Sequence, residues 1–335
     1  DQAFVLNAAA FHLRALGRLT EAVEPMQAGL EARIAQEDWK NAAISASNLS
    51  ELTLTLGDVA RAVAFGGQSV ELADRSCDAF QRMSKRTTWA DALHQSSRRE
   101  ESATAFCEAE AIQAERQPEY PRLYSLQGFR YCDLLLGRAE PAARSGLDGL
   151  ASRAEEAERF RQVCREVLER ARQTLEWAHT QGILLDIALD HLTLGRAHLG
   201  LALTAPQSAA SGEDRATGLA QAAEAMNLAV DGLRRAGTEH HVPRALLARA
   251  ALRRFRSDFA AAAADLTEAL EIAERGPMRL HECDAHLEWA RLCRDQGDLA
   301  AAQQHVARAR VLVEETGYKR REREVRWLEG AVTPA

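Results

Sequence analysis

Similar short sequence segments recur along this chain at an interval of 40 residues, and this repeat limits the possible folds more than any other feature. The stretch LGRLTEAV at residues 16–23 returns as LGDVARAV at residues 56–63. Aligning such phrases gives seven turn-forming positions, with five intervals of 40 residues and one of 80: Gly17, Gly57, Ser97, Gly137, Thr217, Ser257 and Gly297. A fixed period of this length is the signature of a repeat architecture.

Small side chains return at fixed positions after most of these turns. They stand five residues after the turn at Ala22, Ala62, Ser102, Ala222, Ala262 and Ala302, and seven residues later at Gly29, Ser69, Ala109, Ala229, Ala269 and Ala309. A larger residue separates them at Met26, Phe106, Met226, Leu266 and Val306, with Gly66 as the exception. Because steps of three and four residues stay on one helical face, the pattern predicts helices that a neighbouring helix approaches closely.

The repeats are predicted to be stacked helix hairpins. Ala, Leu, Glu and Arg dominate the chain, and runs of β-branched residues are nearly absent, which favours an all-α fold. A single hairpin cannot bury its own apolar face, so successive hairpins must stack into an α-solenoid. We expect one solenoid of about seven hairpins over residues 1–335, followed by a capping helix at 318–330. The expected hairpins span 1–37, 38–77, 78–117, 118–181 with an insertion at 137–160, 182–237 with a loop at 204–216, 238–276 and 277–317.

The second helix of each hairpin resembles that of the tetratricopeptide repeat. The stretches GDVARAVAFGGQSV (57–70), SDFAAAAADLTEAL (257–270) and GDLAAAQQHVARAR (297–310) carry its turn, small and large positions. The period of 40 exceeds the family's usual 34, and the family's first-helix Trp and Tyr are mostly replaced by Leu, Ala or Phe. The resemblance implies a right-handed superhelix whose concave groove is lined by the first helix of each hairpin.

Counting back from each turn identifies the residues expected to line that groove. They are Asn7, Phe11, Arg14, Ser47, Asn48, Glu51, Thr87, Asp91, His94, Gln127, Tyr131, Arg196, Arg254, Arg291 and Arg294. The resemblance implies that Asn7 and Asn48 hold a ligand backbone, and that Arg254, Arg291 and Arg294 meet acidic groups through forked hydrogen bonds. The alternative for each residue is a solvated polar position without a ligand.

The sequence lacks the motifs of catalytic and metal-binding sites that we considered, so we expect a protein that is not an enzyme and binds no cofactor or metal. The sequence contains no GxxxxGK[ST], GxGxxG or GxSxG motif. The stretch HECDAH (281–286) resembles a zinc-protease helix, but His281 and His286 are five residues apart, which separates them by roughly 140° around a helix. Paired His240 and His241 fit a helix start, and the tryptophans fit apolar helical faces.

Charge and cysteine usage limit the partners and the compartment. The net charge is −7 with both signs interleaved, which disfavours nucleic acid and anionic membranes, and no apolar run is long enough to span a membrane. Six cysteines fall at no paired spacing, which is typical of free thiols in a cytoplasmic protein. The closing GYKRREREVRWLEG (317–330) is expected to cover the end of the stack with Val325, Trp327 and Leu328 rather than to bind phosphate.

The leading functional hypothesis is a non-catalytic module that binds a protein or an extended peptide. The bound partner could also be another domain of a longer parent chain. Long repeats and an abrupt start resemble the C-terminal sensor arrays of bacterial STAND-type nucleotide-hydrolysing regulators. Two alternatives remain open: a self-associating structural scaffold, and a small-molecule sensor with its pocket near the fourth and fifth hairpins.

Overall fold

The computed structural model describes residues 19–137, 154–205 and 209–333, which form helices and turns and contain no strand. The expected all-α helical array is therefore confirmed. The chain divides into two compact units. Unit 1 comprises residues 1–123, 273–283 and 310–323, and unit 2 comprises residues 124–272, 284–309 and 324–335. No described helix is long and apolar enough to cross a membrane.

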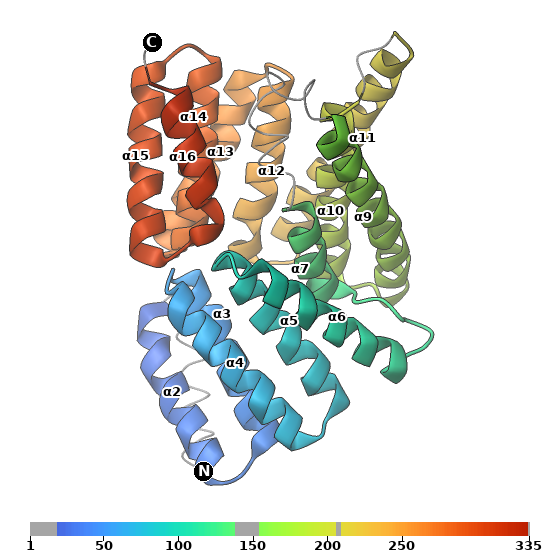
Figure 1. The fold of residues 1–335 in the computed structure, drawn as a ribbon, viewed down its shortest axis with the longest axis vertical. Helices are drawn as coiled ribbons and strands as arrows, with labels where there is room; N and C mark the ends of the chain where they lie inside the picture. Colours follow the sequence, from blue (N-terminus) through green and yellow to red (C-terminus); the bar gives the residue numbers. More distant parts are fainter. Residues whose placement is uncertain (1–18, 138–153, 206–208, 334–335) are drawn as a thin grey trace. The chain divides into compact units, whose positions relative to one another are not determined.

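The helices follow one another in antiparallel hairpins (Figure 1). The first five are α2 (Leu19–Ala35), α3 (Trp39–Thr55), α4 (Val59–Ser76), α5 (Ala79–Gln95) and α6 (Arg99–Arg116). The next four are α7 (Ser125–Leu136), α9 (Ala154–Gln181), α10 (Leu184–Leu203) and α11 (Ala209–Arg235). The rest are η2 (Glu239–His241), α12 (Val242–Phe255), α13 (Phe259–Arg275), α14 (Arg279–Asp295), α15 (Leu299–Thr316), η3 (Lys319–Arg321) and α16 (Glu322–Ala331).

Contacts between first helices make these hairpins a stack. Within unit 1, α3 contacts its partner α4 and also α5, the first helix of the next hairpin. Within unit 2, α10 contacts α7 and α12 in the same way, besides its own partner α11. Within each unit, neighbouring hairpins thus pack against one another, as a solenoid requires.

Recurring turn chemistry sets the hairpin length. Backbone φ is positive at steps of 20 or 40 residues, at Glu37, Gly57, Cys77 and Ser97 and again at Gly237, Ser257, Gly297 and Gly317. This left-handed conformation ends a helix by satisfying its last carbonyl groups. An aspartate often follows and accepts a hydrogen bond from the new helix, as Asp58 does from the Arg61 N–H at 3.0 Å and Asp298 from the Ala301 N–H at 3.0 Å. One dipeptide therefore stops one helix and caps the next.

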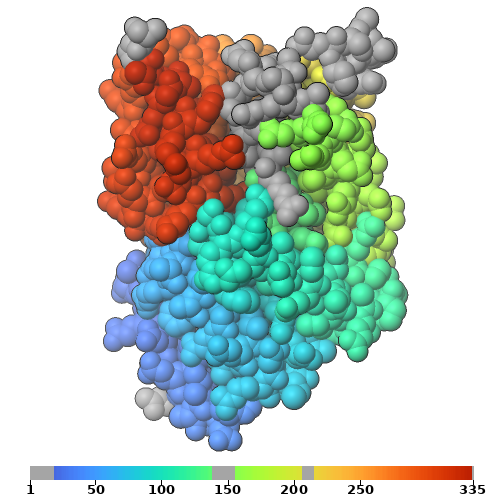
Figure 2. All heavy atoms as spheres, in the orientation of Figure 1, coloured from blue at the N-terminus to red at the C-terminus, as the bar shows by residue number. Residues whose placement is uncertain are grey.

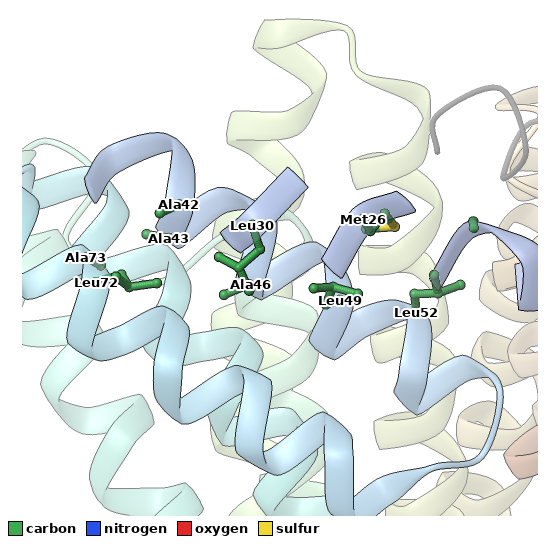
Figure 3. Close-up of a cluster of buried hydrophobic side chains, with 10 residues drawn as sticks. Met26, Leu30, Ala42, Ala43, Ala46, Leu49, Leu52, Leu72 and Ala73 are labelled. Atoms are coloured by element: carbon green, nitrogen blue, oxygen red, sulfur yellow. The ribbon is translucent and has the colours of Figure 1, made fainter. Parts of the chain in front are cut away.

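The repeated small residues lie where helices cross. Ala22, Ala62, Ser102, Ala222, Ala262 and Ala302 are fully buried, as are the large residues Phe106, Met226 and Leu266. In unit 1 a cluster of Met26, Leu30, Leu49, Leu52 and Leu72 with several alanines joins α2, α3 and α4 (Figure 3). The α16 helix, deep red in Figure 2, buries Val325 and Leu328, whereas Trp327 is half-buried.

Three predictions about the fourth and fifth hairpins are wrong. Helix α9 begins at Ala154, inside the insertion predicted at 137–160, whose residues 138–153 lie outside the described residues. Helix α11 begins at Ala209, so the loop predicted at 204–216 is also shorter, and Thr217 lies inside a helix instead of at a turn. Ser and Gly disfavour a helix by only about 0.5–1 kcal/mol each, and the Ala and charged residues between them are good helix formers.

The exception at Gly66 has a steric cause. A Cβ atom on Gly66 would lie 2.9 Å from Cδ1 and 3.1 Å from Cα of Trp89, whereas one on Gly67 would lie 3.6 Å from Trp89 Nε1. Trp89 of α5 therefore fills the space that a large residue of the second helix fills in other hairpins.

We expect Gly66→Ala to lower the free energy of unfolding by about 1–3 kcal/mol, because the added methyl overpacks the α4–α5 crossing. Its matched control is Gly67→Ala, which should be neutral or stabilising by up to about 1 kcal/mol, since alanine is the better helix former and the site has room. Urea unfolding of both variants measures the difference. Equal effects of the two substitutions would contradict the steric explanation.

Candidate functional site

The predicted groove residues of unit 1 separate by exposure. Asn7, Phe11 and Arg14 lie outside the described residues. Asn48 and Glu51 on α3 are half-buried, and Glu51 accepts a 3.4 Å hydrogen bond from the Thr88 hydroxyl. Thr87, Asp91 and His94 on α5 are buried, as is Ser47. The carboxylate of Asp91 accepts a 2.7 Å hydrogen bond from the Gln95 amide. Several polar side chains of α5 are therefore buried inside the unit instead of facing a groove.

The predicted residues on α7 and α10 of unit 2 are more accessible. Gln127 and Tyr131 are half-buried, and the Arg170 guanidinium lies 4.8 Å from the centre of the Tyr131 ring. Arg196 is also half-buried and forms a 2.8 Å ion pair with Asp133, a residue that sequence reasoning did not select. The structure thus places an arginine and a carboxylate together at neighbouring positions of two first helices.

A hollow in unit 2 lies beside this ion pair. Its empty volume is about 430 Å³, including the part open to solvent. The first helices α7, α10 and α12 contribute to its lining through Leu136, Arg196, Leu199, Ala248 and Phe255. The second helices α9 and α11 contribute Phe160 and Met226. Its wall is apolar apart from Arg196, so it suits an apolar group with a polar atom at its edge.

Arg254 and Arg291 lie inside unit 2 and are paired there. Their side chains are 2% and 1% exposed, and both bind Glu288, at 2.8 Å and 2.9 Å. Arg254 also pairs with Asp295 at 2.6 Å, and Arg291 pairs with the buried Glu324 of α16. These guanidinium groups join α12, α14 and α16, so burial keeps them from an external acidic ligand. Arg294, by contrast, is half-buried, pairs with Asp295 and lies over the Trp327 ring.

Two buried carboxylates on α10 were also missed by the sequence reasoning. Asp190 accepts a 2.8 Å hydrogen bond from the Thr174 hydroxyl of α9, and Asp186 accepts a 2.6 Å hydrogen bond from the Ser125 hydroxyl of α7. Burial raises the pKa of Asp190 to about 7, although the Thr174 bond opposes this shift and Asp186 adds to it. The spacing of four residues on one helix face was the available signal, but it does not distinguish buried acids from solvated ones.

Comparisons with known proteins give no function. No protein-family model matches the chain, and no curated protein matches it. Among solved structures, yeast Tom70 is 11% identical with a TM-score of 0.27, over 93% of this chain and 76% of that one. A circular tandem repeat protein with a novel repeat topology is 15% identical with a TM-score of 0.30, over 99% of this chain and 80% of that one. At such low scores neither similarity is informative about ligands.

Proposed function

We propose that the chain is a non-catalytic recognition module that binds a protein or peptide segment along its first helices. The hollow in unit 2 carries this proposal, because the first helices α7, α10 and α12 of successive hairpins all contribute to its lining, beside α9 and α11. An apolar side chain of the partner would enter the hollow, and polar groups beside it would meet Arg196 and Asp133. Preformed helices offer such a surface at little ordering cost. The resemblance to bacterial regulator arrays supports a role as the sensor or scaffold part of a larger protein.

A small molecule with an apolar body is the second candidate for the same hollow. The lining of this hollow is apolar apart from Arg196, which suits an apolar body with a single polar group at its edge. The hollow lies among helices α7, α9, α10, α11 and α12, which supports this candidate.

Filling the hollow should weaken partner binding. We expect peptides selected from a random displayed library on the purified chain to share an aromatic or aliphatic residue. They should bind Ala248→Leu at least about tenfold more weakly, a loss of about 1.4 kcal/mol, because the added side chain occupies the space. Arg196→Gln should also weaken binding without filling the space. Fluorescence anisotropy of labelled peptides measures both effects.

The matched control is Ala300→Leu, the same substitution at an exposed position of α15. Peptides that bind both leucine variants as well as the original chain would overturn the assignment of the hollow. If the library instead yields no binder, but a thermal-shift screen of small apolar compounds yields one that Ala248→Leu loses, the small-molecule candidate replaces the peptide.

A further inference from the structure

One half-buried arginine on α12 has no counter-charge among the described residues. Its neighbours Arg249 and Arg253 both bind Asp265, at 2.7 Å and 2.8 Å. The side chain of Arg244, by contrast, forms neither an ion pair nor a hydrogen bond within the described part of the chain, and its Nε atom is shielded from solvent. Because buried polar groups are normally hydrogen-bonded, this guanidinium is a candidate for contact with a ligand.

Arg244 lies on the face of α12 that lines the hollow. Ala248, Ala251 and Phe255 belong to the lining. Arg244 precedes Ala248 by four residues, so steps of four, three and four residues keep all four side chains on one helical face. The helical rise of about 1.5 Å per residue places Arg244 about 6 Å from Ala248 along the axis. The guanidinium therefore stands one turn beyond the apolar wall.

An aromatic ring holds this guanidinium in place. The Arg244 Cζ atom lies 5.6 Å from the centre of the ring of Phe129, a buried residue of α7. Phe129 precedes the lining residue Leu136 by seven residues, or about two turns of the same helical face. A guanidinium stacked on an aromatic ring keeps a defined plane. The terminal Nη1 and Nη2 atoms of Arg244, unlike Nε, are not shielded from solvent, so a ligand can reach them.

The charges beside the hollow call for an anion. Arg196 and Asp133 neutralise each other at 2.8 Å, so Arg244 adds a positive charge that no described side chain balances. We infer that the partner segment carries an aspartate or glutamate whose carboxylate binds Arg244 while a neighbouring apolar side chain fills the hollow. The two terminal nitrogens can donate parallel hydrogen bonds to the two carboxylate oxygens. This inference rests on the function proposed above and adds the chemistry of the partner.

The geometry of α12 sets the spacing of the two groups in the partner. In an extended peptide, successive side chains point to opposite sides and the rise is about 3.3 Å per residue. Side chains two residues apart therefore point the same way at a separation of about 6.6 Å, which matches the distance of about 6 Å between Arg244 and Ala248 along α12. The acidic residue is expected two positions from the apolar one.

Peptides selected on the purified chain test this inference. They should carry Asp or Glu two positions from the shared aromatic or aliphatic residue. Replacing that acid with its amide should weaken binding at least about tenfold, which corresponds to 1.4 kcal/mol. Arg244→Gln should weaken binding of the acidic peptide by a similar factor and leave that of the amide peptide unchanged. The matched control Arg256→Gln removes the same charge from an exposed position just after α12 and should change neither affinity.

Ionic strength provides a test on the unsubstituted chain, which does not depend on how a variant folds. Between about 50 mM and about 500 mM salt, the acidic peptide should lose more affinity than the amide peptide, because salt screens the charge pair. Binders that share the apolar residue but lack the acid, or equal effects of Arg244→Gln on both peptides, would overturn this inference and leave the proposed function standing. A library without any binder would overturn the peptide proposal and this inference together.

Discussion

Replacing Arg291 with leucine is expected to lower the free energy of unfolding by about 3–5 kcal/mol, because the change leaves the buried Glu324 without its guanidinium and Glu288 paired with Arg254 but no longer with Arg291. The Arg291 side chain is 1% exposed and pairs with Glu288 and Glu324, which are themselves buried. Desolvated carboxylates cannot recover their hydration unless the unit opens. Urea denaturation monitored by circular dichroism measures the loss.

Arg294→Leu serves as the control, since this arginine on the same helix is half-buried and pairs with Asp295. Its substitution should cost no more than about 1 kcal/mol. The double variant Arg291→Leu with Glu324→Leu should lose less stability than the sum of the two single variants, because it removes both charges together. Equal losses for Arg291→Leu and Arg294→Leu would show that the buried pairs do not hold the helices.

Replacing Asp190 with asparagine should stabilise the chain more at alkaline than at acidic pH. The pKa of Asp190 is about 7 in the folded chain, and that of an unfolded aspartate is about 3.9. The folded state therefore binds the proton more tightly, and stability falls as pH rises from about 4 to about 7. Asparagine cannot ionise, so its advantage should grow by about 2–3 kcal/mol between about pH 5 and about pH 8.

Unfolding in urea at those two pH values measures this advantage. Thr174→Val should shift the loss of stability to higher pH, because the Thr174 hydroxyl favours the ionised carboxylate. A stability difference between Asp190→Asn and the unsubstituted chain that stays constant with pH would contradict the raised pKa.

The helical array was predictable because its determinants are local and repeated. Gly57 and Ser257 mark turns by residue type, and Ala62 and Ala262 mark helix crossings by spacing alone. Glu37 and Cys77 take the same left-handed conformation without any residue-type signal. At Glu37 and Cys77 the residue type does not indicate a turn, and only the 40-residue spacing between the two positions could have indicated one.

The chemistry of the candidate site was less predictable because it depends on partners far along the chain. Counting back from the turns placed Arg254 and Arg291 on first helices, but it could not show that Glu288 and Glu324 neutralise them inside the unit. Arg196 was selected by the same counting, whereas its partner Asp133 and the apolar wall beside it come from other hairpins. Periodicity describes what the repeats share, and these contacts involve residues that they do not share.

The dipeptides that end one helix and cap the next also make the chain divisible. Gly57–Asp58 and Cys77–Asp78 carry the same backbone conformation and the same cap, as do Ser257–Asp258 and Gly297–Asp298. Cuts made within two such dipeptides 40 residues apart, as at Ser257–Asp258 and Gly297–Asp298, release one whole period whose ends match other junctions of this kind. Length can therefore be gained or lost in whole periods of 40 residues by duplication or deletion without new turn chemistry, while the side chains on each first helix vary independently.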